Sequence, residues 1–183
     1  MVTNNTETIV LGAGCFWCTE AVYKELKGVI SVTPGYAGGF TSNPNYDAVC
    51  EGDTGHAEVI KIEFDPSIIS LDQLIRIFWD IHDPTSVNRQ GNDVGTQYRS
   101  IILFLNEDQK KTIDASVVQL NNSQDFNQPI VTEIKKLDIF YPAEDYHKDY
   151  YSKNPLMPYC SLIISPKIKH FKEKYHGLLK ENT

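Results

Sequence analysis

Two cysteines near the N-terminus, Cys15 and Cys18, are the residues best suited to chemistry in this chain. They follow an apolar run at residues 8–11 and a glycine-containing turn, and they precede an amphipathic stretch at residues 21–26. This order predicts a strand, a turn and a helix, with Cys15 at the helix N-terminus. Because the free N–H groups and the positive end of the dipole stabilise an anion there, we expect a lowered pKa for the Cys15 thiol and a role as nucleophile.

Composition limits what kind of protein can use these thiols. The chain has 183 residues, 41% hydrophobic and 22% charged, which is typical of one compact domain spanning 1–183. A net charge of −7 without a Lys/Arg-dense segment argues against nucleic-acid binding. We expect no membrane span and no signal peptide, because the longest apolar runs are short and residues 1–7 are polar. Four cysteines are too few for a disulfide scaffold, so the sequence predicts a cytoplasmic, monomeric protein that uses thiol chemistry.

The elements that must position the thiols alternate along the chain. Hydrophobic patterning predicts strands at 8–11, 29–32, 58–64, 100–105 and 131–137, helices at 16–26, 70–82, 106–120, 142–151 and 167–180, loops at 28–45 and 89–96, and an irregular or extended segment at 155–166. This order contains two split β-α-β units. It therefore predicts an α+β fold, a two-layer αβ sandwich with a ferredoxin-like core, helices on one face of the sheet and a C-terminal helical extension.

Five separated motifs carry a family resemblance. They are Gly-Cys-Phe-Trp at 14–17, Pro-Gly-Tyr-Ala-Gly-Gly at 34–39, Gly-His-Ala-Glu at 55–58, Asn-Arg-Gln-Gly-Asn-Asp-Val-Gly-Thr-Gln-Tyr-Arg-Ser at 88–100 and Tyr-Pro-Ala-Glu-Asp-Tyr-His at 141–147. In this order they resemble the A class of the peptide methionine-S-sulfoxide reductase family. The resemblance runs from about Ile9 to about Phe171, which is nearly the whole chain.

The resemblance implies an enzyme that repairs oxidised proteins. The expected activity is reduction of the S epimer of methionine sulfoxide, free or within proteins, and one enzyme serves each epimer. The resemblance also implies thioredoxin as the source of electrons and no metal or organic cofactor.

It assigns roles residue by residue. Cys15 would attack the sulfoxide sulfur, and Glu58 would give a proton to the sulfoxide oxygen. That role needs a partly buried, protonated carboxyl, whereas without the motif Glu58 would be taken for an outward residue paired with Lys61. The remaining assigned side chains surround the substrate: Tyr46 and Tyr98 match hydroxyls that reach the oxygen, Asp93 matches a carboxylate that organises the site, and Phe16 and Trp17 match the pair that packs against the methyl group.

Two thiols are candidates for resolving the sulfenic acid that the attack leaves on Cys15. Many family members carry glycine where this chain has Cys18, and they resolve with a cysteine in a glycine-rich C-terminal tail. Cys18 lies one helical turn from Cys15, as in a redox Cys-X-X-Cys pair, and Cys160 is the cysteine retained near the C-terminus. We favour Cys18, leave Cys160 open, and expect Cys50 to be an inert, half-buried thiol.

Two other classes of protein use a Cys-X-X-Cys pair. A thioredoxin-like disulfide oxidoreductase would place Cys15 and Cys18 after a strand, but would leave the motifs at 55–58 and 88–100 unexplained. A zinc module would use the pair as half of a tetrahedral site, but the sequence offers no second closely spaced Cys/His pair.

Overall fold

A central mixed sheet organises the chain in the computed structural model, which describes residues 6–123 and 125–181. The strands are β1 (Glu7–Ala13), β2 (Val29–Ala37), β3 (Ala57–Phe64), β6 (Ser100–Phe104), β7 (Glu133–Lys136) and β8 (Phe140–Pro142). They lie in the order β7-β6-β1-β3-β2-β8, and only the β6–β7 pair of this sheet is parallel among the described residues. A separate two-stranded hairpin joins β4 (Arg89–Gln90) to β5 (Asp93–Val94).

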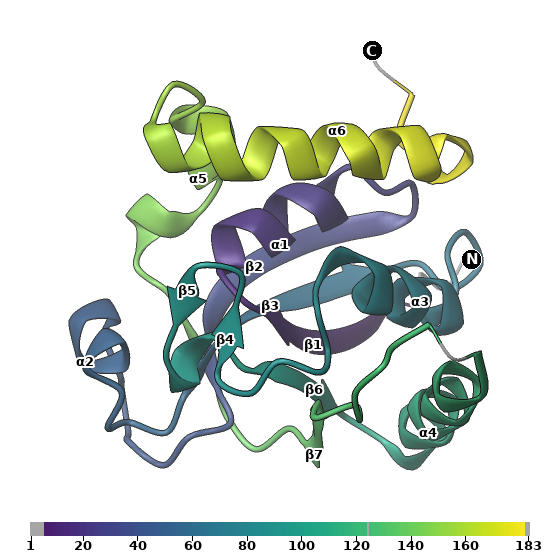
Figure 1. Cartoon of the computed structure of the whole chain (residues 1–183), viewed down its shortest axis with the longest axis horizontal. Helices are drawn as coiled ribbons and strands as arrows, with labels where there is room; N and C mark the ends of the chain where they lie inside the picture. The colour runs from purple at the N-terminus through teal and green to yellow at the C-terminus, as the bar shows by residue number, and fades with distance from the viewer. Residues whose placement is uncertain (1–5, 124, 182–183) are drawn as a thin grey trace.

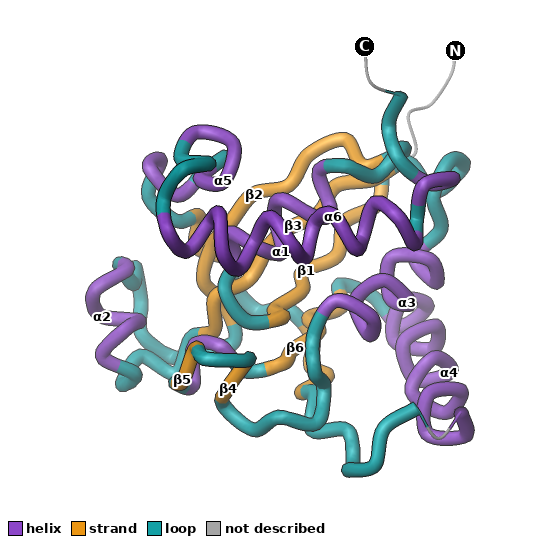
Figure 2. Tube along the Cα trace, turned by 45° about the horizontal axis from the view of Figure 1, so that its top comes forward, coloured by secondary structure: helices purple, strands orange, loops and turns teal. Residues whose placement is uncertain are grey.

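The longer helices gather on one face of this sheet. The helices are α1 (Phe16–Lys24), α2 (Tyr46–Glu51), α3 (Leu71–Ile81), α4 (Glu107–Ser123), α5 (Tyr150–Lys153) and α6 (Ser165–Lys174), with 3-10 turns at Thr96–Tyr98, Asp145–His147 and His176–Leu178. Figure 1 shows α1 lying over β2 and β3, with α6 running alongside α1. Figure 2 shows the same stacking from a second angle, with α3 and α4 side by side. The fold is therefore α+β, with α1 enclosed between the sheet and α6.

Apolar periodicity explains why α1 is held in this place. The main core packs the sheet face against α1, α3 and α6, and fully buried members such as Ile60, Ile62 and Phe64 alternate along β3. The opposite face of the sheet carries a smaller apolar cluster around Val10, Val59 and Ile101. Because β1 runs through the centre of the sheet, the turn after it delivers the N-terminus of α1 to one fixed point of the core.

Most predicted elements are present, with shifted ends. The predicted strands at 58–64 and 100–105 are β3 and β6, and the predicted helix at 70–82 is α3, which begins with a capping box between Ser70 and Gln73. Other regions differ from the prediction. The strand predicted at 29–32 extends to Ala37 as β2, and α2 begins at Tyr46, for which we predicted no helix. The helix predicted at 142–151 is wrong, because this segment contains the end of β8, the 3-10 turn at Asp145–His147 and the start of α5.

The segment 155–166 is helical, so the prediction of an irregular or extended chain was wrong. A π-helical turn at Cys160–Ile164 leads directly into α6, and Pro166 lies in the first turn of that helix. Cys160 and Ile164 are both fully buried, so burial of this apolar run favours the helix.

Candidate active site

Cys15 lies at the N-terminus of α1, immediately after β1. Its carbonyl oxygen accepts hydrogen bonds from the backbone N–H groups of Cys18 and Thr19 at 3.2 and 3.4 Å, which begins the helix. The preceding Gly14 has φ of 88°, and a Cβ there would lie 2.8 Å from the Gln90 side chain. This position therefore requires glycine, both for its left-handed backbone and for the close approach of the β4–β5 hairpin.

Glu58 lies beside Cys15, at the start of β3. Its carboxylate is 2% exposed and accepts a hydrogen bond of 3.0 Å from the backbone N–H of Phe16. Burial raises the pKa of Glu58 from 4.5 to about 8, although the Phe16 N–H opposes this shift, so the carboxyl is largely protonated at neutral pH. The outward orientation toward Lys61 is not observed: the Lys61 ammonium lies 4.0 Å from Glu63 instead.

A cavity of about 200 Å³ joins these two residues to the other side chains singled out in the sequence. Its lining residues are Cys15, Phe16, Trp17, Tyr46, Glu58, Asp93, Tyr98 and Tyr159. Seven of these eight were predicted, and they come from α1, α2, β3, the β4–β5 hairpin and the following turn. The fold therefore brings residues from three of the five motifs, together with Tyr46 and Tyr159, to one small, mostly aromatic cavity.

Tyr159 is the residue of this cavity that sequence reasoning missed. Its hydroxyl donates a hydrogen bond of 2.6 Å to the Asp93 carboxylate and lies 4.0 Å from the Cys18 sulfur. Its ring meets the Trp17 ring edge-on, with 6.0 Å between centroids. The only sequence signal was its position next to Cys160, in the segment that we expected to be irregular.

The motif at 141–147 and the residues after it support one wall of the cavity. The Trp17 indole N–H donates a hydrogen bond of 3.0 Å to His147 Nδ1, and its ring stacks on Tyr150 at 3.7 Å with a 6° angle between planes. Glu144 accepts hydrogen bonds from the Tyr36 hydroxyl at 2.7 Å and from the Tyr46 backbone N–H at 2.8 Å. Burial lowers the pKa of His147, which is consistent with a neutral ring that accepts from Trp17.

The pKa of the Cys15 thiol is raised, so our expectation of a lowered pKa was wrong. Burial, a hydrogen bond with Cys18 and the charge of Glu58 together raise the pKa of Cys15 well above its ordinary value. The hydrogen bond from Cys15 lowers the pKa of Cys18, and the Lys167 ammonium and the Tyr159 hydroxyl act in the same direction. At Cys15, the lowering of the pKa by the helix N-terminus is therefore smaller than the raising of the pKa by burial and by the neighbouring Glu58.

The other two cysteines differ sharply in burial. Cys160 is fully buried, and burial raises the pKa of its thiol. Cys50 is exposed, so our expectation of a half-buried thiol was wrong: it lies on the short helix α2, which packs against the rest of the fold through Val49.

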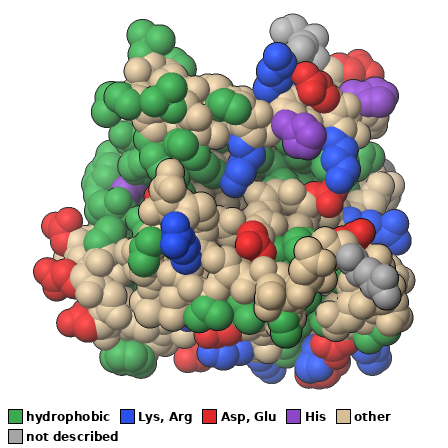
Figure 3. All heavy atoms as spheres, viewed as in Figure 1, with side chains coloured by type: hydrophobic (Ala, Val, Ile, Leu, Met, Phe, Trp, Pro, Cys, Tyr) green, Lys and Arg blue, Asp and Glu red, His purple; other side chains and the backbone are tan. Residues whose placement is uncertain are grey.

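Tyr159 also lines a second, larger cavity. This cavity has a volume of about 680 Å³ and includes Cys15, Cys18, Asp93, Tyr159 and Lys167 in its lining. Ile163, at one edge of this cavity, is 41% exposed and adjoins a surface on which Leu162 is 72% exposed. Figure 3 shows hydrophobic side chains gathered over α5 and the start of α6, the region to which this surface belongs.

The described part of the chain contains neither a candidate metal site nor a candidate membrane span. Within residues 6–123 and 125–181, no group of three or more His, Cys, Asp or Glu side chains is arranged to hold a metal ion. Across the same residues, no helix combines the length and apolar character needed to cross a bilayer.

The chain that carries this buried thiol, protonated carboxyl and aromatic cavity is similar to known proteins. Residues 7–179 match the family model described as peptide methionine sulfoxide reductase. A relative from Saccharolobus solfataricus, named peptide methionine sulfoxide reductase MsrA, is 55% identical over 95% of this chain and 97% of its own length. The chain therefore belongs to the peptide methionine sulfoxide reductase family.

Solved structures agree with this assignment. Mxr1 from Saccharomyces cerevisiae in its reduced form is 38% identical, with a TM-score of 0.77 over 82% of this chain and 87% of that one. Mxr1 has also been solved in complex with Trx2; that structure is 26% identical, with a TM-score of 0.55 over 79% of this chain and 84% of that one.

Proposed function

We propose that the cavity at Cys15 is where this chain reduces methionine S-sulfoxide, free or in oxidised proteins, to methionine. The observation that carries the proposal is the pairing of a buried thiol with a carboxyl whose pKa is raised to about 8, at the end of an aromatic cavity. A sulfoxide needs both groups, because its sulfur must be attacked while its oxygen is protonated.

The first step forms one S–S bond and moves two protons. As the Cys15 sulfur attacks the sulfoxide sulfur, protonated Glu58 gives its proton to the sulfoxide oxygen, and the carboxylate that remains takes up the Cys15 proton. The hydroxyl then passes from the substrate sulfur to the Cys15 sulfur. This breaks the S–O bond of the substrate and the new S–S bond, so that methionine leaves with the electron pair and Cys15 becomes a sulfenic acid.

The substrate is oriented by the rest of the cavity. Tyr46 and Tyr98 offer hydroxyl groups to the sulfoxide oxygen, and burial holds their pKa values well above 10, so both remain protonated donors. Phe16 and Trp17 enclose the methyl group by apolar contact. Asp93 is held by Tyr159 and contributes to the negative field that keeps Glu58 protonated.

Cys18 is the resolving thiol in this proposal. Its side chain is hydrogen-bonded to Cys15, and its pKa is lowered, which favours attack on the sulfenic sulfur. A Cys15–Cys18 disulfide forms and water leaves. Cys160 is fully buried in the same core cluster, and burial raises the pKa of its thiol, which makes it the weaker nucleophile of the two candidates.

Thioredoxin returns the enzyme to its dithiol state. Cys15 lines both cavities, whereas Cys18 lines only the larger of the two. A reducing dithiol can therefore approach the Cys15–Cys18 disulfide through the larger cavity. The solved complex of the relative Mxr1 with Trx2 supports a thioredoxin partner, and the dependence on reduced thiols supports a cytoplasmic location.

We also infer that the chain forms a single domain with a ferredoxin-like core. The strand order β6-β1-β3-β2 within the sheet, with every neighbouring pair antiparallel, supports two interleaved split β-α-β units. The family match over residues 7–179 supports one unit.

The direct test is turnover of separated S and R epimers of a methionine sulfoxide peptide with thioredoxin, thioredoxin reductase and NADPH. Reduction of the S epimer alone supports the proposal. The competing disulfide-exchange function predicts reduction of a disulfide substrate instead, and it predicts that Glu58→Gln leaves that exchange intact. Activity on neither epimer, with dithiothreitol also failing as reductant, would contradict the proposal.

A further inference from the structure

Glu20 is a buried carboxylate of α1 that the proposed reaction does not use. It is 1% exposed, and burial raises its pKa to about 7 against the opposing charges of Lys24, Lys148 and Lys153. Burying a carboxylate is costly, so such a side chain is retained where its hydrogen bonds fix something else.

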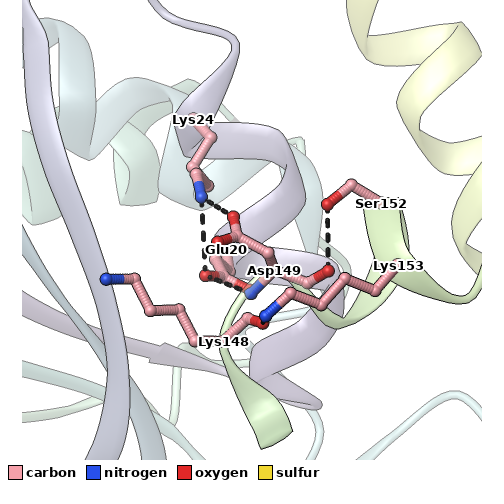
Figure 4. Close-up of polar contacts among 6 residues, drawn as sticks. All are labelled: Glu20, Lys24, Lys148, Asp149, Ser152 and Lys153. Carbon is pink, nitrogen blue, oxygen red and sulfur yellow. Dashed lines mark hydrogen bonds and ion pairs between the residues drawn. The ribbon is translucent and has the colours of Figure 1, made fainter. Parts of the chain in front are cut away.

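Figure 4 shows what Glu20 holds. Its two carboxylate oxygens accept hydrogen bonds from the backbone N–H of Asp149 at 3.0 and 3.1 Å. Lys24, one turn further along α1, forms an ion pair with the Asp149 side chain and lies 3.9 Å from Glu20. The segment before α5 is thus fastened to α1 by both the backbone and the side chain of one residue.

The backbone at Asp149 needs such a fastening. Its φ of 59° and ψ of 29° are left-handed, a conformation that is unfavourable for residues with a Cβ. Asp149 also occupies the N-cap position of α5, where backbone N–H groups lack intrahelical partners. A carboxylate that accepts this N–H therefore stabilises both the strained residue and the start of the short helix.

The residues on either side of this turn form the support behind Trp17. His147, two residues before Asp149, accepts the hydrogen bond from the Trp17 indole. Tyr150, the residue directly after it, stacks on the Trp17 ring at 3.7 Å. A shift of the turn at Asp149 would move both partners of Trp17 together.

We propose that Glu20 is a positioning residue, which fixes the Asp149 turn so that Tyr150 and His147 hold Trp17 in the wall of the substrate cavity. The inference rests on the proposed function only where it assigns the cavity to the methyl group. It requires an acceptor at position 20 and does not require a negative charge there.

Two substitutions separate the acceptor from the charge. Glu20→Ala removes both, and we expect it to raise KM for an S-sulfoxide peptide about tenfold, as loss of one hydrogen bond to a charged group would do, with kcat little changed. Glu20→Gln keeps an amide oxygen for the Asp149 N–H, so its KM should stay within about twofold of the parent value.

Fluorescence tests the positioning without relying on activity. In a Trp79→Phe background Trp17 is the sole tryptophan of the chain. Glu20→Ala should shift the Trp17 emission to longer wavelength and increase its quenching by acrylamide, and Glu20→Gln should do neither. If the parent enzyme and all the variants lack reductase activity, but Glu20→Ala still shifts the Trp17 emission, the proposed function fails while the positioning role stands.

Gln109→Ala is the matched control for general destabilisation. Gln109 is also nearly buried, and it joins the Leu105 N–H to the Thr8 carbonyl on the other side of the molecule. We expect it to lower the melting temperature without changing KM or Trp17 emission. Unchanged KM and emission in Glu20→Ala, or the same changes in Gln109→Ala, would overturn the inference.

Discussion

The two cavities that meet at Cys15 differ in size, lining and chemistry. The smaller, about 200 Å³, is enclosed by aromatic rings and contains a carboxyl that burial keeps protonated. The larger, about 680 Å³, is lined by Cys18 and Lys167. They share Cys15, Asp93 and Tyr159 in their linings. In the proposed mechanism the difference corresponds to two roles: the sulfoxide is reduced in the smaller cavity, and the oxidised thiol pair is reduced from the larger one.

The largest effect should come from the sulfur that both cavities share. Cys15→Ser should show no turnover with thioredoxin or with dithiothreitol, because the oxygen-accepting thiol is gone. Steady-state assays with each reductant check this, and Cys50→Ser, which alters an exposed thiol on α2, should remain active. Any methionine formed by Cys15→Ser would show that another sulfur attacks the substrate.

The next effect belongs to the smaller cavity. Glu58→Gln should lose roughly 10²–10⁴-fold in kcat with either reductant, since a general acid contributes about that much. In the parent enzyme, protonated Glu58 declines as the pH rises through about 8, so activity should fall on that side of the profile. Glu58→Gln should lack this descending limb. A near-parental rate would mean that the proton comes from another group.

Cys18→Ser should affect the reductive side selectively. With thioredoxin, turnover should stop after one equivalent of methionine, whereas a small thiol should still reduce the Cys15 sulfenic acid. Cys160→Ser is the control and should keep thioredoxin-supported turnover. If the two variants exchange these phenotypes, the larger cavity is not the route by which the disulfide is formed and reduced.

A more modest effect is expected from the aromatic wall. Trp17→Ala should raise KM for the sulfoxide by about tenfold, comparable to losing part of a buried aromatic contact, with a smaller change in kcat. The apparent KM for thioredoxin should stay the same, because Trp17 lines only the smaller of the two cavities. Paired titrations of sulfoxide and thioredoxin make the comparison. A rise in both KM values would show that the two sides are coupled.

The last effect concerns stability rather than activity. The pKa of Glu58 rises from 4.5 to about 8 on folding, so the folded state holds this proton more tightly than the unfolded chain. The resulting stabilisation is complete below pH 4.5 and is lost as the pH rises through 8. Glu58→Gln should therefore flatten the fall in unfolding free energy between pH 5 and 8, by up to roughly 3–4 kcal/mol, since one pKa unit corresponds to about 1.4 kcal/mol. Urea denaturation at several pH values checks this, and an unchanged slope would contradict the raised pKa.

Local patterns were sufficient to predict some elements and not others. Strand alternation around Ile60 and Ile62, and the Ser70 cap, depend on neighbours in the sequence, so β3 and α3 could be predicted. The helix through Cys160–Ile164 could not, because Pro158 and Pro166 flank it and its stability comes from burial of Cys160 and Ile164 in a core formed by residues distant in sequence. Tyr159 was missed for the same reason, since its place between the cavities depends on that helix.

The direction of the Cys15 pKa shift is a second feature that could not be predicted from the sequence. Its position at a helix N-terminus could be read from the order of apolar and glycine residues, and the structure has it there. The direction of its pKa depends on burial and on Glu58, which is 43 positions away in sequence and adjacent only in the folded chain. The argument from the helix dipole therefore predicted the wrong direction for the pKa shift of Cys15.

The most direct test of the two-sided account is a single turnover followed by disulfide mapping. The reduced enzyme is mixed with one equivalent of an S-sulfoxide peptide, without reductant, then alkylated and digested for mass spectrometry. The account predicts one equivalent of methionine and a Cys15–Cys18 disulfide, with Cys160 alkylated as a free thiol. A Cys15–Cys160 disulfide, with Cys18 free, would contradict it.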